Sequence, residues 1–362
     1  MTVETHRTAR PRRSRRHATD DGRRALTAGH ALVIALLALV VGCLLNAPGL
    51  HKSAFNQPAG WKRDVALAIT GPLADVSHAL LLDRPRKLLQ DALGRGDEDT
   101  IDTTISFGPT TAASHSTTHS TERPETKPRR AAFSPRHKLR IWVAGDSLVI
   151  TPGWAIIRAA GKARAILPVG GGPDGRVATG LERPDIFNWF THITQQIRKL
   201  RPNAIVLEFG GNDDHGYMTG LPKGVSIGNF GTASWSAEYQ RRVAGLLDTA
   251  NRAGAFVVWI GLPITRDPAQ TQRFDAINAI ISAEARKRKG QVAFVDTYAT
   301  FASDSGGFAQ YLTDTSGRQI LVRAPDGVHF EHAGGDMIAR MVLHALNEQF
   351  DLLSWRKQRA SP

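Results

Sequence analysis

Residues 139–148 read LRIWVAGDSL, and this stretch decides how the chain folds. Its first six residues form an almost uninterrupted apolar run, with the length typical of a strand that is buried on both faces. Strands of this kind occur in parallel sheets that helices cover on both sides. Gly145 permits a tight exit from the strand, so Ser147 is expected just beyond the strand's carboxyl end.

Four more short apolar runs follow, and amphipathic segments separate them. The runs span residues 163–169, 203–210, 255–261 and 291–296, and the helix-like segments span residues 185–200, 236–252, 270–288 and 332–349. Strands that alternate with helices predict a parallel sheet with helices on both faces. The predicted fold class is therefore α/β, as a three-layer α/β/α sandwich in residues 138–362. Such sheets bind their ligands beyond the carboxyl ends of the strands.

Two further fragments are expected at the same edge of the sheet. Asn212, in GGND at 210–213, follows the third apolar run, and its amide can donate a hydrogen bond to an oxyanion. Asp326 and His329, in DGVH, precede the last helix. A nucleophilic serine needs a base, and the base needs an acceptor that orients it. Each fragment alone also fits an ordinary turn or a helix cap, but their conjunction predicts a reactive serine.

With these fragments in place, the chain from about Leu139 to about Phe350 resembles the GDSL/SGNH hydrolase superfamily, whose fold is flavodoxin-like. The resemblance implies that Ser147 is the nucleophile. It also implies that His329 is the general base and that Asp326 orients the histidine ring. This chemistry needs neither a cofactor nor a metal ion.

The resemblance also implies an oxyanion hole. Its donors are the backbone N–H groups of Ser147 and Gly180 and the side chain of Asn212. The glycine of this set is the least sharply defined, and one of the glycines at 170–172 is an alternative to Gly180. The segment TGLERPDIFNWF at 179–190 further resembles a poorly characterised, membrane-anchored branch of the superfamily.

Most of the net charge of +13 comes from two segments of the chain, and the rest of the chain is close to neutral. Residues 1–30 have a net charge of +5 and residues 126–140 a net charge of +6, which together make eleven of the thirteen charges. A basic face that could grip a phosphate backbone is therefore not expected, and no nucleic-acid partner is predicted. Cys43 is the one cysteine, so neither a disulfide within the chain nor a cysteine-based metal site can form.

The run ALVIALLALVVGCLL at 31–45 predicts a membrane segment. We expect a transmembrane signal anchor at residues 26–50, preceded by a basic tail at residues 1–25. The eight arginines of that tail place it in the cytoplasm and the rest of the chain outside the cell membrane, as a single-pass protein. A cleaved signal peptide, or a lipoprotein signal that ends at Cys43, remains an alternative.

Two segments connect the anchor to the predicted domain. Residues 51–95 form a juxtamembrane helical segment, with apolar residues at three- and four-residue steps. It is either a stalk that packs on the main domain or an interaction element near the membrane surface. Residues 96–137, rich in Ser, Thr, His and Pro, predict a disordered linker that would let the domain reach a polymer near the membrane.

The sequence therefore predicts a membrane-anchored, extracytoplasmic serine esterase or O-acyltransferase. The expected substrates are O-acyl groups, such as acetyl, on glycans of the cell envelope, an expectation that rests partly on analogy with the superfamily. A lipid ester or a thioester is the alternative substrate. A further alternative is a non-catalytic envelope scaffold that has kept the fold.

Overall fold

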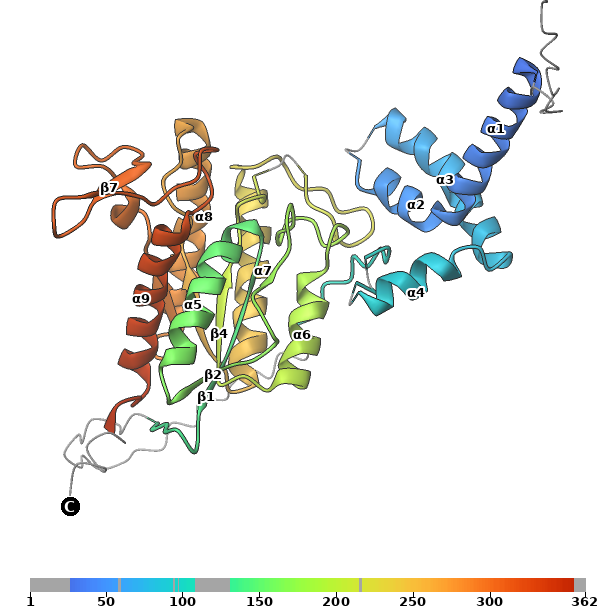
Figure 1. The fold of residues 1–362 in the computed structure, drawn as a ribbon. Coiled ribbons are helices and arrows are strands. Elements are labelled where there is room, and N and C mark those ends of the chain that lie inside the picture. The colour runs from blue at the N-terminus through green and yellow to red at the C-terminus, as the bar shows by residue number, and fades with distance from the viewer. Residues whose placement is uncertain are drawn as a thin grey trace, which may run out of the picture. The chain divides into compact units, whose positions relative to one another are not determined.

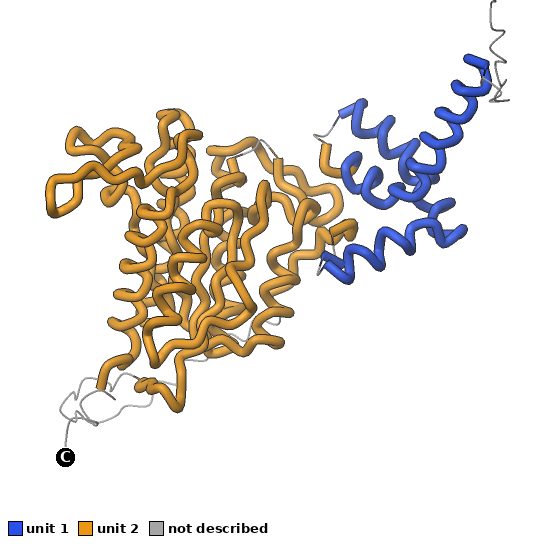
Figure 2. Tube along the Cα trace, in the orientation of Figure 1, with its two compact units in different colours: residues 1–54, 59–96 blue, residues 55–58, 97–362 orange. Residues whose placement is uncertain are grey.

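The computed structural model describes residues 27–57, 60–93, 95–96, 98–107, 131–214 and 217–354. The chain divides into two compact units (Figures 1 and 2). One is built from residues 1–54 and 59–96, and the other from residues 55–58 and 97–362. The predicted basic tail at residues 1–25 lies outside the described residues.

The larger unit is built on a parallel sheet with the strand order β2-β1-β4-β5-β6, and a short β3 also pairs with β1. The strands are β1 (Leu139–Gly145), β2 (Ile166–Pro168), β3 (Asp174–Gly175), β4 (Ala204–Glu208), β5 (Phe256–Ile260) and β6 (Val292–Val295). Each of the five predicted apolar runs contains one of the five main strands. The order is that of flavodoxin-like sheets, so the predicted fold class is confirmed.

Alternate side chains of the strands pack into two apolar cores, one on each face of the sheet. Trp142 and Leu207 point to the core beneath α6, α7 and α8, whereas Ile141 and Val206 point to the core beneath α5 and α9. Figure 1 shows α5 and α9 side by side. The helices are α5 (Ile150–Lys162), α6 (Trp189–Leu200), α7 (Ala233–Arg252), α8 (Pro268–Lys287) and α9 (His332–Gln349). The four predicted helices are thereby confirmed.

Sequence patterns did not reveal α5, because its first turn contains Pro152 and Gly153, a pair typical of loops. Proline is tolerated in the first turn of a helix, where its missing N–H has no partner to lose. Gly153 is needed for packing, because a Cβ there would lie 2.5 Å from the Cβ of Pro173. A 3-10 turn, η2 (Ala299–Phe301), and an antiparallel hairpin of β7 (Tyr311–Thr313) and β8 (Gln319–Leu321) were also not predicted.

The smaller unit consists of four helices: α1 (Ala28–Leu45), α2 (Ala47–Phe55), α3 (Trp61–Ala79) and α4 (Arg84–Ala92). In the described part of the chain, α1 is the one single helix that is long and apolar enough to cross a membrane, and none of its residues is buried. It ends at Leu45, before the expected boundary at residue 50. Asn46 leaves the helical conformation, with φ −110° and ψ 13°, and a new helix begins at Ala47.

The predicted linker at residues 96–137 is shorter in the structure, because both of its ends pack on the α/β unit. Asn188 donates to the carbonyl oxygens of Asp102 and Thr104, at 3.1 and 2.8 Å. Phe107 packs edge to face on Phe190, with 5.6 Å between ring centroids. Residues 108–130 lie outside the described residues.

The other end of this segment is fixed by Phe133. Its ring is buried against Phe350, with 5.4 Å between centroids, and its N–H donates to Asp351 at 2.9 Å. Because Phe107 and Phe133 both lie on the α/β unit, the chain between them starts and ends on that unit. The prediction that all of residues 96–137 form a flexible linker is therefore wrong at both ends of that range, and with it the expected reach of forty residues.

We therefore expect the α/β unit to need residues 98–137. A protein that begins at residue 138 should be less stable to urea than one that begins at residue 98, by about 2–5 kcal/mol, because it lacks two packed phenylalanines. Phe107→Ala alone should lower the free energy of unfolding by about 1–3 kcal/mol. Val225→Ala, at an exposed loop position, is the matched control. Equal stability of the two truncated proteins would show that the segment does not contribute.

Candidate active site

Ser147 lies where the strand order of the sheet reverses. It opens a short 3-10 turn, η1 (Ser147–Val149), directly after β1. From β1 the sheet continues on one side to β2 and on the other to β4. Ligand sites of doubly wound sheets form at this switch point, at the carboxyl ends of the strands. The fold therefore places Ser147 at the position expected for a reactive group.

The structure joins Ser147, His329 and Asp326 by hydrogen bonds, although the serine is 182 residues away from the histidine in sequence. The distance from His329 Nε2 to Ser147 Oγ is 2.9 Å. On the other side of the ring, His329 Nδ1 lies 2.7 Å from Asp326 Oδ2. The Oδ1 atom of Asp326 accepts from the N–H groups of Val328 and His329, at 2.8 and 3.0 Å.

The charge of Asp326 defines the direction of these hydrogen bonds. Partial burial raises the pKa of this carboxyl, but the N–H groups of Val328 and His329 and the histidine ring outweigh it and lower the pKa to about 2. Asp326 is therefore ionised at neutral pH and can only accept hydrogen bonds. The proton of a neutral His329 ring must then reside on Nδ1, so Nε2 is left as the acceptor for the hydroxyl proton of Ser147.

Arg323, which the sequence analysis did not single out, holds the loop that carries the histidine. Its guanidinium donates to the carbonyl oxygens of Ile264, Val328 and His329, at 2.6, 2.6 and 3.3 Å. The side chain is fully buried and stacks on Phe330, 4.8 Å from the ring centroid. Burial lowers the pKa of Arg323 to about 10, against the opposing effect of nearby carboxyl groups, so it remains charged.

Asp146 ties the serine turn to the neighbouring loop. It is fully buried, and its Oδ1 atom accepts from the N–H of Leu148 at 2.9 Å. Its Oδ2 atom accepts from the N–H groups of Gly210 and Gly211, at 3.1 and 2.9 Å. Burial, together with the charge of Asp213, raises the pKa of Asp146 to about 7, while the three N–H donors oppose the increase. The sequence motif contains this residue, but its role is visible only in the fold.

The structure brings Asn212 and Gly180 to the same edge. The side-chain nitrogen of Asn212 donates to the carbonyl oxygen of Thr179 at 3.0 Å, and this carbonyl belongs to the peptide whose nitrogen is that of Gly180. Gly170, one of the alternative glycines, instead lies against Trp142. The geometry therefore favours Gly180 among the candidates.

Asp213 explains why residue 180 is a glycine. Its carboxylate accepts from the N–H groups of Leu181 and Glu182, both at 2.9 Å, and from the hydroxyl of Tyr239 at 2.8 Å. A Cβ on residue 180 would lie only 2.0 Å from Asp213 Oδ1. Burial raises the pKa of Asp213, and the two backbone donors and Tyr239 oppose the increase.

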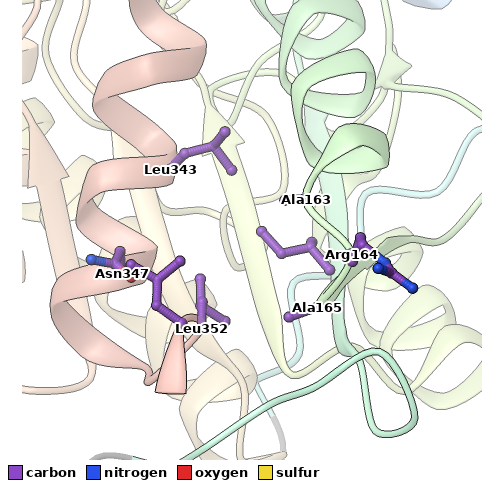
Figure 3. Close-up of a pocket in the computed structure, with 8 residues that line it drawn as sticks. Ala163, Arg164, Ala165, Leu343, Asn347 and Leu352 are labelled. Atoms are coloured by element: carbon purple, nitrogen blue, oxygen red, sulfur yellow. The ribbon is translucent and has the colours of Figure 1, made fainter. Parts of the chain in front are cut away.

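The hollows described in the larger unit lie at the opposite edge of the sheet. One, of about 210 Å³, lies between the start of β2 and the end of α9 (Figure 3). The residues around it are Ala163, Arg164, Ala165, Ile166, Leu343, Asn347, Leu352 and Leu353. None of them is a predicted site residue. Among the described residues, no group of three or more His, Cys, Asp or Glu side chains is placed to hold a metal ion.

Gly180→Ala tests the fit between residue 180 and Asp213. The added methyl group cannot coexist with the present carboxylate position, so we expect a loss of about 1–3 kcal/mol in the free energy of unfolding. Gly161→Ala is the matched control, because a Cβ there meets nothing within 4 Å. Urea titration of both variants measures the difference. Equal stability of Gly180→Ala and the unchanged protein would contradict the packing described here.

The chain is similar to several solved structures. Similar solved structures include a GDSL-like lipase from Bacteroides thetaiotaomicron VPI-5482, with 17% identity, a TM-score of 0.39 and coverage of 58% of this chain and 88% of that chain. A carbohydrate esterase family 3 protein from Talaromyces cellulolyticus has 16% identity, a TM-score of 0.40 and coverage of 58% and 97%. A lipase/acylhydrolase from Enterococcus faecalis has 13% identity, a TM-score of 0.40 and coverage of 57% and 94%.

A search of the curated proteins found no significant match. A family model matches residues 140–345, which include all of β1 but its first residue, the serine turn and most of α9. The chain therefore belongs to the family described as "Protein of unknown function (DUF459)".

Proposed function

We propose that the protein is a serine ester hydrolase in which Ser147, His329 and Asp326 act as a catalytic triad. One observation carries the proposal: the unbroken hydrogen-bonded series from Ser147 Oγ through both ring nitrogens of His329 to Asp326, with distances of 2.9 and 2.7 Å. An activated serine requires this arrangement of nucleophile, base and orienting acceptor. Residues without a shared role are not expected to form this series of two hydrogen bonds.

In the first half of the reaction, Ser147 Oγ attacks the carbonyl carbon of an ester while His329 Nε2 takes the hydroxyl proton. The negative charge of Asp326 stabilises the imidazolium that forms. The tetrahedral intermediate then expels the alcohol oxygen, which receives the proton from His329. The products are a free alcohol and an acyl group bound to Ser147.

In the second half, water attacks the acyl group and His329 takes its proton. Collapse of the second tetrahedral intermediate releases the carboxylic acid and returns the proton to Ser147. A hydroxyl of a second glycan in place of water gives acyl transfer with the same proton movements. The arrangement of the triad serves both outcomes, so the choice depends on which acceptor reaches the site.

The oxyanion of each intermediate is held by the N–H groups of Ser147 and Gly180 and by the side-chain amide of Asn212. The bond from Asn212 to Thr179 orients that amide. Fixed donors of this kind need no rearrangement as negative charge develops.

We further propose that the substrates are small O-acyl groups on glycans of the cell envelope. The location supports this, because the eight arginines before α1 favour an extracytoplasmic position for everything that follows α1. The β7–β8 hairpin adds support. It exposes Tyr311 beside Leu321, and Thr313 hydrogen-bonded to Gln319 at 2.7 Å. An exposed aromatic ring with hydrogen-bonding groups beside it is a surface that can bind a sugar.

The triad is tested by Ser147→Ala. We expect loss of labelling by a fluorophosphonate probe and a fall in esterase activity of at least about a thousandfold, because the nucleophile is removed. Ser282→Ala, a change of a surface serine on α8, is the control and should keep full labelling. Circular dichroism shows whether the fold is intact. A folded Ser147→Ala protein with unchanged turnover would exclude the mechanism, and an unchanged protein that never labels would favour a non-catalytic scaffold.

The glycan proposal is tested in cells and with the purified protein. Glycan O-acetylation should change when the gene is deleted, and the Ser147→Ala strain should show the same change. The purified protein should cleave acetyl esters faster than long-chain esters. If glycan acylation is the same in all strains and long-chain esters or thioesters are cleaved preferentially, the substrate is a lipid ester or a thioester, and only the esterase proposal stands.

A further inference from the structure

The smaller unit exposes an apolar surface along α3 and α4, which we call the α3–α4 apolar face. Its members are between 48% and 72% exposed: Trp61, Val65, Ile69, Val76, Leu80, Leu81, Leu88, Leu89 and Leu93. Soluble monomers rarely expose so many large apolar side chains in two consecutive helices. In the described part of the chain nothing covers this face, so it needs an occupant from outside the unit.

The opposite side of α3 packs inside the unit. Ser77 is fully buried, and Thr70 lies within hydrogen-bond distance of His51 on α2, at 3.2 Å. Trp61, Val65 and Ile69 follow one another at four-residue steps and therefore share the other side of the helix. Helix α3 is thus apolar on the side that faces away from its own unit.

Helix α1 identifies the occupant. It has no charged residue, none of its residues is buried, and its mean hydropathy of 2.5 suits the hydrocarbon interior of a bilayer. The hydroxyl of Ser77 donates to the carbonyl oxygen of Leu44 at 2.6 Å, in the last turn of α1. Helix α3 is therefore attached to the last turn of α1, the end of the apolar helix that lies next to the rest of the unit.

The charges of α3 and α4 favour a position along the membrane rather than across it. Lys62 lies next to Trp61, with its Nζ atom 5.9 Å from the ring centroid, and Arg84 and Lys87 begin α4. Acidic residues also lie on these helices: Asp64, Asp75 and Asp91. Tryptophan and basic residues are typical of the boundary between head groups and acyl chains. Helices α3 and α4 meet at 85°, so they can both lie in the plane of the membrane, whereas a straight span is excluded.

We propose that the α3–α4 apolar face lies in the lipid head-group boundary of the leaflet from which α1 emerges. The unit is then held by one crossing helix and by two helices on the surface. Two surface helices restrict rotation of the unit about the axis of α1, which a single crossing helix cannot do. The occupant is the bilayer itself, and this inference does not depend on the proposed esterase activity.

The experiment uses the full chain in vesicles of phosphatidylcholine and phosphatidylglycerol. Cys43→Ser removes the native thiol, and single cysteines are then introduced at Ile69, Leu88 and His78 and labelled with an environment-sensitive fluorophore. His78 is the matched control, because its side chain is 81% exposed and lies on the other side of α3. Ile69 and Leu88 are exposed, so neither change disturbs packing within the unit. Circular dichroism checks that the helices remain.

We expect emission from positions 69 and 88 to shift to shorter wavelength. It should be quenched more strongly by lipids with a nitroxide near the head group than by lipids with a nitroxide at mid-chain. Position 78 should show neither effect. Water-like emission at 69 and 88 would overturn the proposal, and so would stronger quenching at mid-chain, which indicates a deeply inserted pair. Disulfide cross-linking between copies of the unlabelled Ile69→Cys protein, together with no lipid quenching of the labelled protein, would identify a second copy as the occupant. This result would also overturn the proposal.

Discussion

The geometry at the carboxyl edge of the sheet depends on the buried carboxylate of Asp146. The backbone can bring β1 and β4 into register, but it cannot by itself fix the two loops that leave these strands. Asp146 does so by accepting from Leu148 in the serine turn and from Gly210 and Gly211 in the neighbouring loop. A buried carboxylate is costly unless such donors surround it. An asparagine at this position has a similar shape, but it would present its NH₂ group to at least one of these N–H donors. It therefore could not replace Asp146 in holding the two loops.

A second buried carboxylate extends this arrangement to the third loop. Asp213 follows Asn212 directly, and it accepts from Leu181 and Glu182, which follow Gly180. The loop that contains Gly180 is therefore fixed to the loop that contains Asn212, the two loops that supply the proposed oxyanion donors. The Asp213 carboxylate binds backbone N–H groups, so these contacts restrict the movement of the backbone itself. Preorganised donors of this type are what stabilisation of an oxyanion requires.

Sequence patterns predicted the parallel sheet and the placement of Ser147, Asp326 and His329 at one edge of it, because both leave local signals: apolar runs of strand length, and polar residues in the loops that follow. They missed what depends on contacts between distant segments. Arg323 looks like an ordinary basic residue until the fold surrounds its guanidinium with three carbonyl oxygens. Residues 98–107 look disordered by composition, yet one aromatic residue, Phe107, packs against Phe190 and α7. Helix α5 was hidden by Pro152 and Gly153, whose loop-like local preference is overridden by packing.

Arg323 and Glu208 show why the histidine loop can be held by a buried cation without a strong ion pair. Both carboxyl oxygens of Glu208 are buried without a hydrogen-bond partner in the described structure. Burial, helped by Asp146, raises the pKa of Glu208 well above its usual value, while Arg323 opposes the increase. The hydrogen bonds of the guanidinium go instead to three carbonyl oxygens, and two of these belong to Val328 and His329. Arg323 is thus bound by the same backbone that it positions, while the charge of Asp326 orients the ring of His329 from the other end of the loop.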